Sequence, residues 1–121
     1  MKTILLVEDD PFIVDIYANQ LKKEGYRVDV AMDGQAALNK IRSQKPDLLV
    51  LDIGLPKMDG WEVLRLVRSD AKTENVKTIV ISNNSPKDYE DHIAKLKVIK
   101  YFLKVEATPE EIIKTVNEVL N

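Results

Sequence analysis

The chain has 121 residues, with 18 lysines and arginines against 20 aspartates and glutamates and a formal net charge of −2. This length fits one domain, residues 1–121, that can bury a substantial core. The near-neutral charge gives no indication of a nucleic-acid or membrane partner. The absence of cysteine excludes disulfides and thiol catalysis and argues against a zinc site. No apolar run approaches the roughly 18 residues of a transmembrane helix, so we expect a cytoplasmic protein.

The first predicted strand, residues 4–7, is wholly apolar and ends in the acids Glu8, Asp9 and Asp10. An aspartate followed by Pro11 is a typical start of a helix. Gly25 is a typical end for that helix. Its 3.6-residue periodicity predicts a buried stripe of Phe12, Ile13, Ile16, Tyr17 and Leu21.

Residues 27–31 alternate weakly between apolar and polar and predict a short second strand. A second helix is expected to begin at Asp33 and Gly34 and to end before Pro46. The third strand, residues 47–51, is an apolar run that leads directly into Asp52. Asp52 therefore lies where a buried strand leaves the core. A carboxylate at such a position is poorly solvated, so we expect it to have a function.

Asp59 and Glu62 have the spacing of a capping box for a third helix, whose Trp61 we expect to be partly exposed. Residues 78–81 predict a fourth strand that ends in Ser82. A charged fourth helix with a thin apolar stripe follows, capped by Ser85-Pro86, and its His92 is expected to be solvated. The fifth strand, residues 99–103, ends at Lys104, and residues 108–111 start the last helix.

Five strands that alternate with five helices predict an α/β fold with a parallel sheet covered on both faces. The carboxyl ends of parallel strands share one edge, where ligands bind in such sheets. Three carboxylates at this edge would repel one another unless a cation neutralised them. Oxygen ligands without histidine or cysteine favour Mg²⁺, with Mn²⁺ as the alternative. The residues that we expect to meet there are Glu8, Asp9, Asp52, Ser82 and Lys104.

A lysine and a hydroxyl at the same edge provide a charge and a hydrogen-bond donor for an anion. A site with a divalent cation and an anion-binding lysine suits a phosphoryl group, because phosphoryl transfer depends mainly on positioning and charge neutralisation. Asp52 is the carboxylate that could act as a nucleophile and form an aspartyl phosphate. Each residue alone has a simpler explanation, such as helix capping, and the set at four strand ends carries the prediction.

Over essentially its whole length the chain resembles the receiver domain of two-component response regulators. The resemblance rests on residues 4–10 (ILLVEDD), 52–60 (DIGLPKMDG), 79–82 (IVIS) and 101–104 (YFLK), in this order and spacing. It implies a flavodoxin-like (βα)5 doubly wound sandwich with a five-stranded parallel sheet of order 2-1-3-4-5. It also implies that the chain is a phosphoacceptor switch in a phosphorelay rather than an enzyme.

The resemblance further implies a role for each site residue. Asp52 would accept the phosphoryl group of a histidine kinase's phosphohistidine in a Mg²⁺-dependent step. Glu8 and Asp9 would hold the Mg²⁺ together with the Asp52 carboxylate and the backbone carbonyl of Gly54. Ser82 and Lys104 would bind the phosphoryl oxygens, and Tyr101 would be the switch aromatic that turns inward when Ser82 moves.

The partners implied by the resemblance are a sensor histidine kinase or a phosphotransfer protein, and a downstream effector. The effector would bind the face formed by the fourth helix, the fifth strand and the fifth helix. A phosphorylation-dependent dimer is compatible with this reading, whereas direct binding to nucleic acid or to a membrane is not expected.

The chain departs from the family pattern at several positions near the site. Val105 follows Lys104 where the family usually has proline, and we expect a trans peptide bond there because a cis bond without proline costs several kcal/mol. Lys97-Val98 replaces the common Gly-Ala, so we expect a rebuilt turn before the fifth strand. Asn83 stands where a small residue is usual and could crowd the phosphoryl pocket or hydrogen-bond within it. Gly54 has no side chain with which to tune hydrolysis.

Three other classes of protein share parts of this pattern. A phosphatase of the haloacid dehalogenase type needs a second aspartate two residues after its nucleophile, and Gly54 stands at that position. A flavodoxin-like cofactor carrier would need a glycine- or hydroxyl-rich loop after the first strand, where this chain has residues 8–11, Glu-Asp-Asp-Pro. A degenerate receiver that acts only as a protein-interaction module stays open, because the surroundings of Ser82 and Lys104 are unusual.

Overall fold

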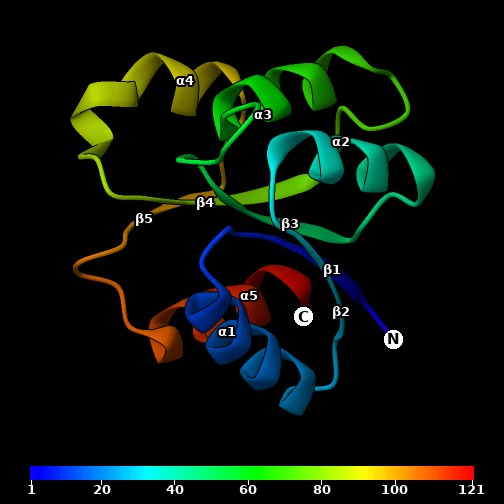
Figure 1. The fold of residues 1–121 in the computed structure, drawn as a ribbon, viewed down its shortest axis with the longest axis vertical. Coiled ribbons are helices and arrows are strands. Elements are labelled where there is room, and N and C mark those ends of the chain that lie inside the picture. Colours follow the sequence, from blue (N-terminus) through cyan, green and yellow to red (C-terminus); the bar gives the residue numbers. More distant parts are fainter.

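The computed structural model describes all 121 residues and shows five parallel strands in one central sheet (Figure 1). The strand order is β2-β1-β3-β4-β5, which confirms the predicted doubly wound topology. Each strand bound lies within one residue of its predicted position. The strands are β1 (Thr3–Val7), β2 (Arg27–Ala31), β3 (Leu48–Asp52), β4 (Lys77–Ser82) and β5 (Lys100–Leu103).

Five α-helices cover both faces of the sheet in Figure 1, two on one side and three on the other. The pair consists of α1 (Pro11–Lys23) and α5 (Pro109–Leu120). The opposite layer consists of α2 (Gly34–Ser43), α3 (Gly60–Ser69) and α4 (Glu90–Lys95). None of these helices combines the length and the apolar character needed to cross a membrane.

The central strands β1 and β3 are buried on both faces, which explains why their residues form unbroken apolar runs. Successive side chains along each strand point to opposite faces. Leu5 and Leu49 therefore belong to the core under α2 and α3. Their neighbours Leu6 and Val50 belong to the core under α1 and α5. This two-sided core holds the carboxyl ends of the strands at one edge.

Helix α1 is rotated relative to the predicted stripe. Phe12 and Ile16 were predicted to be buried, but their side chains are 80% and 46% exposed. Leu21 is buried and Tyr17 is packed partly against the core, as predicted, but the other inward residues are Ala18 and Val14. This stripe has the same helical spacing, and the small Ala18 lets the helix approach the sheet closely. Periodicity alone does not determine which apolar residues of this helix face the sheet.

The segment after β4 begins as predicted but contains less regular helix. Ser85 accepts a hydrogen bond from the backbone N–H of Lys87 and starts a 3₁₀ turn, η1 (Pro86–Tyr89). The following α4 has six residues, none of them fully buried, and no side chain caps its N-terminus. Short helices of this kind depend on tertiary contacts for their stability.

The turn between α4 and β5 is built without glycine. Lys97 has φ 55°, the left-handed conformation that glycine favours. Its N–H donates to the carbonyl of Ala94, and the N–H of Val98 donates to Ile93, so the last carbonyls of α4 are satisfied. Lys97 itself thus takes the strained position at this turn.

Replacing Lys97 with glycine should raise the free energy of unfolding by about 0.5–1 kcal/mol, because glycine removes the left-handed strain at the cost of a more flexible unfolded chain. Lys95→Gly is the matched control, since Lys95 is an exposed residue of regular helix. That change should lower stability by about 1 kcal/mol. Chemical denaturation of both variants measures the two effects, and a destabilised Lys97→Gly variant would contradict the strain assigned to this turn.

Candidate functional site

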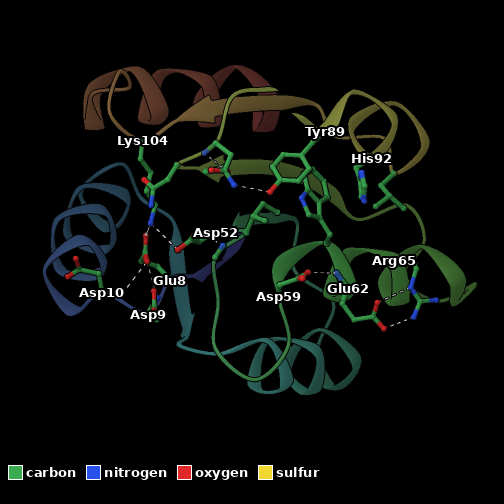
Figure 2. Close-up of a pocket in the computed structure, with 17 residues that line it drawn as sticks. Glu8, Asp9, Asp10, Asp52, Asp59, Glu62, Arg65, Tyr89, His92 and Lys104 are labelled. Atoms are coloured by element: carbon green, nitrogen blue, oxygen red, sulfur yellow. Dashed lines mark hydrogen bonds and ion pairs between the residues drawn. The ribbon is translucent and has the colours of Figure 1, made fainter. Parts of the chain in front are cut away.

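Three acids gather at the carboxyl edge of the sheet (Figure 2). Asp52 is the last residue of β3, and Glu8 and Asp9 directly follow β1. One carboxylate oxygen from each of the three lies within 4.8 Å of the others. Glu8 and Asp52 are buried, whereas Asp9 is exposed. The predicted juxtaposition of these acids is therefore present in the structure.

Lys104, directly after β5, joins the two buried acids. Its ammonium lies 2.9 Å from Oδ2 of Asp52 and 2.9 Å from Oε1 of Glu8. The Lys104 side chain is only 17% exposed, so these contacts are poorly screened by water. One positive charge thus serves two buried carboxylates, and the cluster with Asp9 keeps an excess of negative charge.

Backbone N–H groups hold the remaining carboxylate oxygens. Oε2 of Glu8 accepts from the N–H groups of Asp9 and Asp10 at 3.0 and 3.3 Å. Oδ1 of Asp52 accepts from the N–H of Gly54 at 3.0 Å. Both buried acids are therefore fixed in orientation by the loops that follow their strands.

The electrostatic balance of the cluster shows in the pKa values of its members. Burial and the neighbouring Asp52 raise the pKa of Glu8 to about 7, although Lys104 acts in the opposite direction. Burial alone would lower the pKa of Lys104, but its contacts with Glu8 and Asp52 raise it. Lys104 is thus firmly charged, while Glu8 easily takes up a proton.

The donor set fits a hard divalent cation. It consists of carboxylate oxygens alone, with no nitrogen or sulfur ligand, and one acid is open to solvent. A cation next to Glu8 would lower its pKa again and remove the penalty of two buried carboxylates side by side. Gly54 is exposed, and an added Cβ would meet only Oδ1 of Asp52, at 3.9 Å, so this side of the cluster is open.

Gly60 lets α3 start directly against the end of β3. A Cβ at this position would lie 2.6 Å from the backbone oxygen of Asp52, too close for any other residue. Asp59 caps the helix by accepting from the N–H of Glu62 at 3.0 Å, which is one half of the predicted capping box, whereas the Glu62 carboxylate accepts from Arg65. The sequence Asp59-Gly60 therefore fixes the loop that carries Asp52.

Ser82 and Tyr101 are linked through Asn84, a residue that the sequence did not single out. Ser82 is buried at the end of β4, and its Oγ accepts from the N–H of Asn84 at 3.0 Å. The hydroxyl of Tyr101 donates to the backbone carbonyl of Asn84 at 2.6 Å. Asn83, by contrast, is exposed and lies on the wall of the cavity beside the acids.

The cavity next to Asp52, of about 950 Å³, also has an aromatic wall that sequence reasoning missed. Trp61 was expected to be partly exposed, but it is buried, with 8% of its surface accessible. His92 is exposed as expected, yet its ring lies 5.0 Å from that of Trp61 and 5.7 Å from that of Tyr89. The helical spacing of Tyr89, Ile93 and Leu96, four and three residues apart, was the available signal that this segment packs on the rest of the chain.

The peptide bond between Lys104 and Val105 is trans, as predicted, since no peptide bond of the chain is cis. The lysine still reaches both acids. The replacement of proline by Val105 therefore does not remove Lys104 from the site.

Comparison with known proteins identifies the family of this chain. The profile of the family "response regulator receiver domain" matches residues 4–117. The regulator of alkaline phosphatase synthesis PhoP of Bacillus subtilis is 48% identical over 67 residues, which are 55% of this chain and 28% of PhoP. The probable transcriptional regulator TcrX of Mycobacterium tuberculosis is 37% identical over 94 residues, which are 78% of this chain and 38% of TcrX. The chain thus spans well under half the length of these two curated relatives.

Solved structures are similar over nearly the whole chain. The chemotaxis response regulator CheY4 of Vibrio cholerae has a TM-score of 0.89 at 26% identity, covering 99% of both chains. The Mn(2+)-bound form of response regulator Rcp1 has a TM-score of 0.83 at 26% identity, covering 98% of this chain and 91% of the other. The chain therefore belongs to the response regulator receiver domain family and has the flavodoxin-like fold of its chemotaxis members.

Proposed function

We propose that Asp52 accepts a phosphoryl group from the phosphohistidine of a sensor histidine kinase or a phosphotransfer protein. The observation that carries this proposal is the buried Asp52 carboxylate, fixed between Lys104 and the N–H of Gly54 at the edge of a cavity. An oxygen of Asp52 forms the bond to phosphorus while the bond from phosphorus to the histidine nitrogen breaks. The electron pair of that bond stays on the leaving imidazole.

The groups around Asp52 suit this transfer. Lys104 is charged and can bind an oxygen of the phosphoryl group on Asp52, because its ammonium already contacts the Asp52 carboxylate. The Oγ of Ser82 accepts a hydrogen bond from Asn84, so its own proton is free to be donated to a phosphoryl oxygen. The chain acts here as acceptor and switch and not as an enzyme that turns over a separate substrate.

We further propose Mg²⁺ as the cation of the acid cluster, with Mn²⁺ as a substitute. Glu8 and Asp9 would hold it together with Asp52 and the backbone carbonyl of Gly54. When bound, the cation supplies positive charge that offsets the carboxylates and the transferred phosphoryl group. The proposal places the chain in the cytoplasm, since phosphohistidine is made from ATP inside the cell.

Two exposed apolar side chains next to the site support a protein as the phosphoryl donor. Phe12 is 80% exposed and Val105 82% exposed. Phe12 follows the acidic segment by two residues, and Val105 follows Lys104 directly. A partner that delivers its phosphohistidine to Asp52 would cover both.

The output surface is proposed to be the face of α4, β5 and α5. Helix α4 has no fully buried residue and β5 lies at the edge of the sheet, so both can rearrange at low cost. An effector, or a second copy of the phosphorylated chain, would bind there. Neither nucleic acid nor a membrane is proposed as a direct partner.

Asp52→Asn should abolish labelling, because the amide is not a nucleophile towards phosphorus. Wild type incubated with acetyl phosphate and Mg²⁺ should gain the mass of one phosphoryl group by intact mass spectrometry. Asp15→Asn, an exposed aspartate on α1, is the control and should label normally. Labelling of the Asp52→Asn protein would show that another residue is the acceptor. If wild type is not labelled, the chain is a degenerate receiver that acts only as a protein-interaction module.

Binding of Mg²⁺, expected in the millimolar range or somewhat tighter, should weaken as pH falls. The raised pKa of Glu8, about 7, means that the cation must displace a proton from this carboxylate in acid. Below that pKa the affinity should drop by up to about ten-fold per pH unit. Titrations followed by the fluorescence of the single tryptophan, Trp61, measure the effect.

In the same titration Glu8→Gln should bind more weakly but lose this pH dependence, since it has no proton to release. Asp9→Ala should show no metal response at any pH. A normal titration of Asp9→Ala would place the cation elsewhere, and an unchanged pH profile in Glu8→Gln would assign the proton to another group.

Phe12→Ala should slow phosphoryl transfer from a phosphorylated histidine phosphotransfer domain by about 5–30-fold, the effect of losing 1–2 kcal/mol at an interface. The rate with acetyl phosphate should stay the same, because Phe12 lies outside the site. Ile99→Ala is the matched control, an exposed apolar residue that precedes β5 and so lies towards the opposite edge of the sheet. Equal losses with both donors would show that Phe12 supports the site and not the docking.

A further inference from the structure

The side of the cavity opposite Glu8 and Lys104 is formed by an aromatic cluster of Trp61, Tyr89 and His92, of which Figure 2 labels Tyr89 and His92. The rings of Trp61 and Tyr89 lie 5.1 Å apart at an interplanar angle of 52°. Tyr89 and His92 meet edge to face. Trp61 belongs to α3, Tyr89 ends η1 and His92 lies on α4. The cluster therefore joins α4 to the helix that starts beside Asp52.

One donor in this cluster has no acceptor. Nε1 of Trp61 is shielded from solvent and makes no hydrogen bond. A buried donor without a partner costs free energy comparable with a lost hydrogen bond. The neighbouring ring, that of Tyr89, carries a hydroxyl that can accept a hydrogen bond, and its centroid lies 5.1 Å from that of Trp61. A rearrangement of Tyr89 that gave Nε1 an acceptor would remove this cost.

Asn84 connects the cluster to Ser82, and its backbone and its side chain bind different partners. Its backbone N–H donates to Oγ of Ser82, and its backbone carbonyl accepts from Tyr101. Its side-chain Nδ2 donates to the hydroxyl of Tyr89 at 2.8 Å. A movement of Ser82 is thus passed on by two arms of hydrogen bonds. One arm runs through the backbone carbonyl of Asn84 to Tyr101 on β5, and the other runs through the Asn84 side chain to Tyr89 at the start of α4.

Ile93 in the middle of α4 packs against the core, and the two ends of the helix are held by different contacts. At its C-terminal end Nε of Arg68 donates to the carbonyl of Leu96 at 2.8 Å. The same guanidinium donates to Val76 and Thr78 and so ties this end to β4. The N-terminal end has no cap and is held through Tyr89 and the aromatic cluster. Release of Tyr89 would let this end move while the other end stays fixed.

We propose that Asn84 is a positioning residue that couples Ser82 to the N-terminal end of α4 through Tyr89, in parallel with the link to Tyr101. The proposal rests on the proposed phosphorylation of Asp52, because the Ser82 hydroxyl would move in order to donate a hydrogen bond to the phosphoryl group. When Ser82 turns to that group, its bond to the backbone of Asn84 changes. The Asn84 side chain then releases Tyr89, and the aromatic cluster repacks with Nε1 of Trp61 satisfied.

The chain offers two unique reporters of this cluster, because it has one tryptophan and one histidine. We would add beryllofluoride with Mg²⁺ to the full chain and follow the emission of Trp61 and the ring NMR signals of His92. Asn84→Ala and Tyr89→Phe cut the arm to α4 and leave the backbone bonds of Asn84 in place. Tyr101→Phe cuts the other arm and is the matched control. Labelling of each variant by acetyl phosphate is measured by mass in parallel.

Both arm variants should lose most of the change in Trp61 emission and in the His92 signals, while Tyr101→Phe keeps it. A full response in Asn84→Ala and Tyr89→Phe, or its loss in Tyr101→Phe, would overturn the proposal. Loss of labelling in both arm variants would also overturn it, because these residues would then act on the chemistry. If wild type itself is neither labelled nor responsive, the proposed phosphorylation fails instead.

Discussion

The contact of one lysine with two buried carboxylates determines how the rest of the site is built. Glu8 and Asp52 lie side by side away from water, and Lys104 is the positively charged side chain that pairs with both of them. Removing one partner of a buried ion pair typically costs about 3–5 kcal/mol. Lys104 comes from β5, two strands from β3, so its side chain has to pass the end of β4. Only a long side chain at this strand end can make that contact.

Much of this arrangement could be predicted because the sequence marks each strand end. Glu8, Asp52, Ser82 and Lys104 each follow an apolar run, and a parallel sheet brings such ends to one edge. Covered faces give the unbroken apolar runs of β1, β3 and β4, which is why the bounds of these strands are within one residue of prediction. The chemistry of the site therefore follows from local sequence and one topological rule.

The features that could not be predicted depend on how elements face one another. The apolar residues of α1 fit two stripes, and packing against the sheet chose the one that leaves Phe12 exposed. Trp61 is buried because Tyr89 and His92, from a segment about thirty residues later, cover it. The contacts of Asn84 are made by its backbone and its amide in a loop, where no periodicity exists to read.

The sharing of Lys104 also gives a physical reason why cation and phosphoryl group should act together. A phosphoryl group on Asp52 adds negative charge and attracts the lysine away from Glu8. Glu8 would then be a buried acid with only the N–H groups of Asp9 and Asp10 as partners, unless it took up a proton or met a cation. A divalent cation held by Glu8 and Asp9 removes this cost and frees Lys104. The raised pKa of Glu8 and the position of Lys104 are thus two consequences of the same excess of negative charge.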